Sequence, residues 1–289
     1  MKIPRFTPPE LALVGVTILW GFTFLVIRNA MQVSGPLFFV GVRFACAALA
    51  LSLISLRVLR GLTLHEVFAG AVIGAGLFAG FALQTAGLQS VSASKSAFIT
   101  AFYVPAVPLF QWIFWKRPPH LGAWIGIGLA FIGLIFMAGP DEISSGYGEG
   151  EFLTFLSAIA FAAEIILIGL FAGRVNVRRV VIVQVAVASF LAFLTMPVFG
   201  ESVPPFSWLL VYSACGLGIM SAVIQSVMNW AQRSISPTRA TIIYAGEPIW
   251  AGIFGRMAGE RLSMGALLGG LLIVLGVLVS GLKKGRVKE

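Results

Sequence analysis

The sequence predicts an all-α integral membrane protein whose ten transmembrane helices form two inverted five-helix repeats. Three observations support this fold class. The 289 residues are 58% hydrophobic and only 11% charged, with a mean hydropathy of +0.97, whereas soluble domains carry about 25% charged residues. The apolar residues fall into ten long runs, and the second half of the chain repeats features of the first.

Each predicted span holds about 20 mostly apolar residues, enough to cross roughly 30 Å of hydrocarbon. Short connections, several of them containing Pro or Gly, separate the runs. The first run follows Lys2 and Arg5 but is long and lacks a small-residue cleavage site, so we expect a retained span rather than a signal peptide. The predicted spans are 10–31, 36–57, 66–89, 93–115, 121–139, 151–173, 178–199, 206–231, 238–258 and 263–282.

The positions of Lys and Arg predict the orientation, because cytoplasmic loops retain them. With the N-terminus inside, fifteen of them fall on the inner side and four on the outer side, with Arg43 left within a span. We therefore expect both termini in the cytoplasm and a bacterial-type inner membrane as the location. The net charge of +9 does not predict a nucleic-acid partner, because the charges flank apolar runs instead of forming one basic surface.

The two halves of the chain echo each other. Residues 90–95 resemble 234–239 at an offset of 144, and Pro105 matches Pro248 at an offset of 143. Because each half holds five spans, the second half starts on the opposite side of the membrane, so the repeats must be inverted. We expect the first repeat over 1–140, a periplasmic linker over 141–150 and the second repeat over 151–289. This plan is typical of secondary transporters, which bind their solute between the halves.

Several short motifs resemble those of the drug/metabolite transporter superfamily. They are Trp20-Gly21, Arg43-Phe44, the Ser/Lys stretch that leads to Pro105, Glu247-Pro248 and Gly259-Glu260-Arg261-Leu262. The resemblance covers nearly the whole chain as two tandem EamA-type domains and extends to bacterial amino-acid exporters, including those for aromatic amino acids. It implies ten helices, cytoplasmic termini and a central cavity framed by the first four helices of each half.

Charged residues inside spans are candidates for function, because each costs about 2.5–3.5 kcal/mol at a helix centre unless it faces protein or water. Arg43 is interpreted first as a structural clamp between helices, with a solute-binding role as the alternative. Glu164 is expected to carry a proton or bind a solute ammonium group, or else to pair with Arg43. Glu247 precedes Pro248 and is expected either to face the cavity or to bond backbone groups that the proline leaves without a helical partner. Pro105 and Pro248 are expected to kink their helices, either as hinges or simply as widenings of the cavity.

Deep aromatic and amide side chains complete the predicted solute site. A buried Trp or Tyr needs a partner for its polar atom, which a polar cavity supplies, and amides can bind a zwitterion or tie helices together. Ordinary packing is the alternative for each of them. The residues are Trp20, Tyr103 and Tyr244 among the aromatics and Gln84, Gln225 and Asn229 among the amides. Trp112 and Trp208, near span ends, are expected at the membrane interface.

The remaining motifs point away from catalysis. Cys46 and Cys215 lie in apolar runs without a C-x-x-C neighbour, so no disulfide framework, metal or cofactor is predicted. No nucleotide-binding or hydrolase motif occurs in a suitable context, and we expect no enzyme activity. The small-residue pairs Gly122/Gly126 and Gly265/Gly269 predict close packing of the fifth and tenth spans.

The sequence therefore predicts a secondary transporter that exports amino acids, aromatic ones among them, or similar small metabolites by alternating access. Its partners would be this solute and the lipid bilayer, and the oligomeric state is left open, a monomer included. Alternatives are an exporter of cationic drugs or other metabolites with the same fold, an uncoupled facilitator or channel, and a membrane enzyme or scaffold. The solute and the coupling ion are not predicted.

Overall fold

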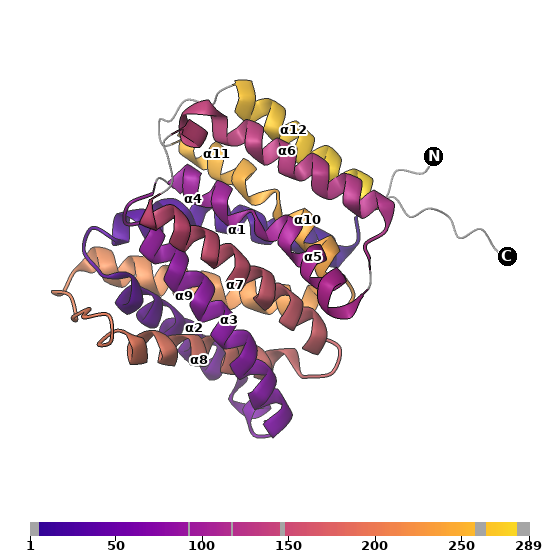
Figure 1. The fold of residues 1–289 in the computed structure, drawn as a ribbon. Helices are drawn as coiled ribbons and strands as arrows, with labels where there is room; N and C mark the ends of the chain where they lie inside the picture. The colour runs from indigo at the N-terminus through magenta and orange to yellow at the C-terminus, as the bar shows by residue number, and fades with distance from the viewer. Residues whose placement is uncertain (1–5, 92, 117, 145–147, 258–263, 282–289) are drawn as a thin grey trace.

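The chain is α-helical throughout the residues that its structure, a computed structural model, describes: 6–91, 93–116, 118–144, 148–257 and 264–281 (Figure 1). No β-strand occurs in these ranges. The helices are α1 (Pro8–Ala30), α2 (Pro36–Leu59), α3 (Leu64–Gly87), α4 (Ala93–Thr100), α5 (Tyr103–Trp115), α6 (Leu121–Ser144), α7 (Glu149–Phe171), α8 (Val177–Thr195), α9 (Trp208–Ala231), α10 (Pro237–Tyr244), α11 (Glu247–Met257) and α12 (Met264–Gly281).

Among the described residues, seven helical segments are long and apolar enough to cross a membrane: α1, α2, α3, α7, α8, α9 and the segment Ser96–Phe114. Shorter apolar stretches lie in α6 and α12. At 1.5 Å per residue, the 23 residues of α1 span about 35 Å, more than the hydrocarbon thickness of a bilayer. When α4–α5 and α10–α11 are each counted as one segment, the twelve helices give ten, close to the positions expected from the sequence.

The surface of the bundle is apolar and part of its interior is polar, the reverse of a soluble protein. Large hydrophobic side chains such as Ile54, Val198 and Leu53 are 82%, 80% and 72% exposed. Trp112 and Trp208 are also exposed, at 49% and 62%, and each lies within four residues of a helix end. An all-helical protein with this surface is suited to a lipid environment.

Two membrane-length segments are interrupted, and both interruptions lie just before a proline. Residues Ala101 and Phe102 separate α4 from α5, and Ala245 and Gly246 separate α10 from α11. Pro105 and Pro248 fall in the first turn of the helix that follows, where the missing N–H costs no intrahelical bond. Each segment is thus divided into two short helices whose ends lie inside the protein.

The helices of the two halves pack against each other. α1 contacts α9, α10 and α11, while α2 contacts α8 and α9, and α3 contacts α7 and α8. α6 and α12 lie side by side at one edge of the bundle (Figure 1). A Cβ at Gly276 of α12 would lie 2.6 Å from the Gly126 carbonyl oxygen of α6, so this close approach requires glycine. The small-residue pairs predicted that these two spans pack closely, although Gly276 was not among them.

Helices extend into the expected linker over 141–150 from both sides. Helix α6 continues to Ser144 and α7 begins at Glu149, and residues 145–147 lie outside the described ranges. The early start of α7 follows from its cap, because Glu151 Oε2 accepts a hydrogen bond from the Gly148 N–H at 2.8 Å. The motif at 259–262 also lies outside the described residues.

Candidate functional site

A cavity lies at the centre of the bundle, where helices from both halves meet. Its walls come from α1, α3, α4, α5, α7, α9 and α11. The cavity has a volume of about 30 Å³. This volume holds one or two water molecules and is too small for a larger solute. The lining residues are Trp20, Thr23, Phe24, Phe81, Gln84, Thr100, Tyr103, Phe161, Glu164, Ile165, Met228 and Glu247.

The helix interruptions place polar groups directly in this cavity. Tyr103 is the first residue of α5 and Glu247 the first of α11. The Tyr103 hydroxyl donates to Glu247 Oε2 at 3.3 Å, and both side chains are buried. A helix N-terminus carries partial positive charge and unpaired N–H groups, which favours a carboxylate at the start of α11.

The second carboxylate, Glu164 on α7, is held by a network of amide side chains. It is 2% exposed, and its Oε1 accepts a hydrogen bond from Gln184 Nε2 at 3.2 Å. Gln184 Nε2 also donates to Gln225 Oε1 at 2.8 Å, and Asn229 Nδ2 donates to Gln184 Oε1 at 3.1 Å. The network therefore orients Glu164 from α8 and α9 without placing a cation beside it.

The structure brings five of the eight predicted solute-site residues to the cavity wall and leaves three behind it. Trp20, Gln84, Tyr103, Glu164 and Glu247 line the cavity. The other three support this wall: Gln225 and Asn229 belong to the amide network, and Tyr244 packs edge-on against Trp20 with ring centroids 5.0 Å apart.

Several wall residues were not predicted from the sequence, chief among them Phe81, Phe161, Thr100 and Met228. Phe and Met inside apolar helices show no pattern that separates a cavity wall from lipid contact. Thr100 accepts a hydrogen bond from Gln84 Nε2 at 3.1 Å, a pairing between α3 and α4 that only the packing reveals. Gln184, the centre of the amide network, was also missed.

The expected pair between Arg43 and Glu164 is absent. Arg43 is 1% exposed, and its Nε donates to Ser221 Oγ at 2.8 Å. Its Nη1 and Nη2 have no hydrogen-bond partner among the described residues. Glu164 has amide partners instead, Gln184 and Gln225.

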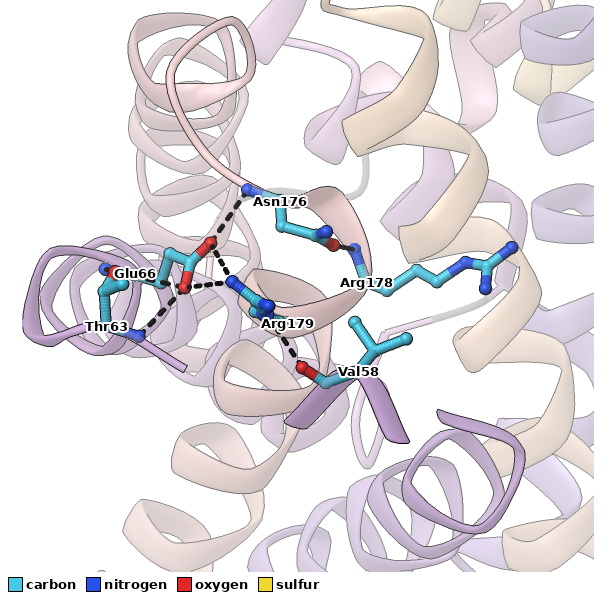
Figure 2. Close-up of polar contacts among 6 residues, drawn as sticks. All are labelled: Val58, Thr63, Glu66, Asn176, Arg178 and Arg179. Carbon is cyan, nitrogen blue, oxygen red and sulfur yellow. Dashed lines mark hydrogen bonds and ion pairs between the residues drawn. The ribbon is translucent and has the colours of Figure 1, made fainter. Parts of the chain in front are cut away.

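A polar cluster ties the two halves together at one end of the bundle (Figure 2). The Glu66 carboxylate accepts hydrogen bonds from the backbone N–H of Thr63 at 2.9 Å and of Asn176 at 3.1 Å. Arg179 Nη1 lies 3.3 Å from both Glu66 oxygens, and its Nε donates to the Val58 carbonyl at 2.8 Å. This cluster, the Glu66 latch, joins the C-terminal end of α2 and the N-terminal end of α3 to the N-terminal end of α8.

A second carboxylate holds the other end of the same helix pair. Glu201 follows α8 in the chain, and its two oxygens accept hydrogen bonds from the backbone N–H groups of Leu37 at 3.0 Å and Phe38 at 2.7 Å. Both N–H groups belong to the first turn of α2, where no intrahelical acceptor exists. This Glu201 latch was not predicted, because its partners lie more than 160 residues away in the sequence.

The two cysteines are far apart in the sequence, but their side chains lie in contact between α2 and α9. Cys46 Sγ lies 3.1 Å from Cys215 Sγ, and both are free thiols. No group of three or more metal-ligating side chains occurs in the described part of the chain. The polar groups available for chemistry there are thus hydrogen-bonding and ionisable side chains around a small cavity.

Comparisons with known proteins agree with this architecture. The EamA-like transporter family matches residues 7–139 and 148–282. An uncharacterized transporter of Archaeoglobus fulgidus is 28% identical, covering 95% of this chain and 86% of its own, and the uncharacterized inner membrane transporter YedA of Escherichia coli K12 is 29% identical, covering 91% and 87%. A crystal structure shares the fold with a TM-score of 0.73 at 17% identity, over 96% of this chain and 98% of the other. This chain belongs to the EamA-like transporter family, a family of multi-pass membrane transporters.

Proposed function

We propose that this transporter exports amino acids or similar small metabolites across the inner membrane by alternating access. Two inverted five-helix halves, 1–140 and 151–289, would move against each other about the central cavity, with the linker 141–150 on the periplasmic side and both termini in the cytoplasm. The excess of Lys and Arg on one side supports this orientation, and the family supports the transport role.

The observation that carries the proposal is the composition of the cavity wall. Two buried carboxylates, Glu164 and Glu247, face a space whose other walls are largely aromatic and aliphatic. A buried carboxylate in a membrane protein is a candidate for binding a cationic group or a coupling proton. The aromatic faces of Trp20 and Tyr103 suit the apolar body of a solute. An amino acid has both features.

The two latches support alternating access. The Glu66 latch and the Glu201 latch hold opposite ends of the α2–α8 pair, and the cavity is too small for an amino acid. In the proposed mechanism, release of one latch at a time would open one face of the protein and enlarge this cavity. The interruptions before Pro105 and Pro248 supply the flexible points at which the half-helices would tilt.

Efflux from proteoliposomes tests this function. Purified protein is reconstituted into vesicles loaded with labelled L-phenylalanine, L-leucine or L-lysine, and efflux is followed for wild type and for Glu164→Gln and Glu247→Gln. We expect wild-type efflux of at least one amino acid and loss of most of it in both variants. Glu149→Gln is the matched control, because Glu149 is exposed at the start of the same helix as Glu164. No efflux of any amino acid by wild type would refute the substrate proposal, and normal efflux by both site variants would refute the site.

A second candidate function is export of cationic drugs or other amines. The cavity lining itself holds two carboxylates and no cationic side chain, which favours a cation as solute. Efflux of labelled amines from the same vesicles distinguishes this candidate. Counterflow, the accumulation of labelled solute against an excess of unlabelled solute, separates a carrier from an uncoupled facilitator or channel.

A further inference from the structure

The Arg43 guanidinium is an unpaired charge in the interior of the bundle. Arg43 is among the largest fully buried side chains, and of its five N–H groups one, on Nε, reaches an acceptor, Ser221 Oγ. Nη1 and Nη2 have no partner among the described residues. An arginine that acts as a structural clamp would donate its N–H groups to carbonyl or carboxylate oxygens of neighbouring helices. The Nη1 and Nη2 groups of Arg43 make no such bonds to the described residues.

Two aromatic rings lie close to the guanidinium. Its Cζ lies 4.5 Å from the centroid of the Phe81 ring and 5.6 Å from that of Phe44. Such cation–π contacts lower the cost of burying the charge, but they leave the N–H groups without acceptors. A buried polar group without a partner marks a place where a ligand or another functional role is expected.

One aromatic ring separates Arg43 from the central cavity. Phe81 lines the cavity and packs edge-on against Phe161, another wall residue, with ring centroids 5.1 Å apart. The Arg43 partner Ser221 also lies one helical turn before Gln225, at a spacing that places two Cβ atoms about 5–6 Å apart. Gln225 belongs to the network that holds Glu164. Arg43 on α2 and Glu164 on α7 are thus both linked to α9, through residues that lie one helical turn apart.

We propose that Arg43 binds the carboxylate of the transported solute on Nη1 and Nη2, while Glu164 binds its ammonium group. Arg with a carboxylate forms a bidentate, charge-assisted pair. An α-amino acid carries its ammonium and carboxylate groups on the same carbon, so one solute presents an anion to Arg43 and a cation to Glu164. Entry of the carboxylate moves the Phe81 ring aside. The inference rests on the proposed transport function and narrows the solute to α-amino acids, to the exclusion of amines that lack a carboxylate.

Exchange measurements with matched solutes test the inference in wild-type protein. Proteoliposomes exchange labelled L-phenylalanine against unlabelled L-phenylalanine or phenethylamine, which differ in the carboxylate; L-leucine and 3-methylbutylamine form a second pair. We expect the amine to compete about tenfold or more weakly than its amino acid. Equal competition by amine and amino acid would overturn the inference while leaving transport intact. Exchange of neither member of either pair, together with no wild-type efflux of any amino acid, would instead remove the proposed function, and this inference with it.

Two variants locate the discrimination at Arg43. Arg43→Gln is expected to weaken amino-acid exchange and to bring the amine and the amino acid to within about twofold of each other, because the carboxylate no longer finds a cation. Arg43→Lys keeps the charge but loses the bidentate fork, and we expect intermediate discrimination. Elution as a single species in detergent checks folding. If Arg43→Gln does not fold, Arg43→Lys decides: discrimination equal to wild type in the variant that folds would overturn the assignment.

Discussion

The Glu66 latch offers a direct test of alternating access. In Glu66→Gln the side chain keeps one acceptor oxygen, which can satisfy one of the two backbone N–H groups now bound, of Thr63 or of Asn176. Its new NH₂ group is a donor, and so is Arg179 Nη1, 3.3 Å from the present carboxylate. The variant therefore loses one charge-assisted hydrogen bond and the ion pair.

The size of the effect follows from these contacts. A hydrogen bond to a charged group contributes about 1.5–3 kcal/mol, and the ion pair contributes little more because the Arg179 side chain is 23% exposed. We expect the closed arrangement at this end to lose about 2 kcal/mol. That energy shifts the population toward the state open at this end by roughly thirtyfold.

Thiol labelling measures the shift. Cys46 and Cys215 are first replaced by alanine, and a cysteine is placed at Met228 in the cavity wall. A membrane-impermeant maleimide is then added to vesicles from either side. Glu66→Gln should speed labelling from the face that carries the α2–α3 connection and slow it from the opposite face.

Glu201→Gln is the matched control, because Glu201 caps α2 at the opposite end of the α2–α8 pair. It should produce the reverse pattern of labelling. If both variants speed labelling from the same face, or if neither changes it, the latches do not control access and the mechanism proposed here is wrong.

Two further predictions concern contacts between helices. Gly276→Ala should lower the melting temperature in detergent, at a cost of about 1–3 kcal/mol, because its Cβ would lie 2.6 Å from the Gly126 carbonyl oxygen. Gly128→Ala is the control and should leave the melting temperature unchanged, because nothing lies within 4 Å of its Cβ. Equal melting temperatures of the two variants would contradict the packing. Copper phenanthroline should oxidise Cys46 and Cys215, whose sulfurs are 3.1 Å apart, to a disulfide that slows efflux until dithiothreitol reduces it. Efflux that is unchanged in the cross-linked protein would show that α2 and α9 do not separate during transport.

Much of the fold followed from composition and period alone. Ten apolar runs predicted the segments seen in the structure, since a span in lipid must be long, apolar and helical to satisfy its own backbone. The positions of Pro105 and Pro248 predicted disturbed helices, and both segments are interrupted just before these residues. The pairs Gly122/Gly126 and Gly265/Gly269 predicted close packing of the fifth and tenth spans, and α6 and α12 do approach closely, although the close contact that Gly126 makes is with Gly276, outside those pairs.

The candidate site was predictable only at residues whose charge or polarity is unusual within an apolar span. Glu164 and Glu247 stood out because a charge in an apolar run is costly, and both line the cavity. Phe81 and Phe161, which line it equally, could not be distinguished from the many Phe residues that contact lipid or pack in the interior. Gln184 was overlooked as a single amide in α8, although it bonds both Glu164 and Gln225.

The sequence by itself determined that this chain is a helical membrane protein, which residues form its spans, and which buried charges need a reason. These properties depend on local composition, because each residue in a span adds its own free energy of transfer into lipid. Only the tertiary structure decided which charges meet: it paired Glu66 with Arg179 across 113 positions and left most of the Arg43 fork without a partner. Contacts between helices distant in the chain depend on packing geometry, to which neither hydropathy nor helical period is sensitive.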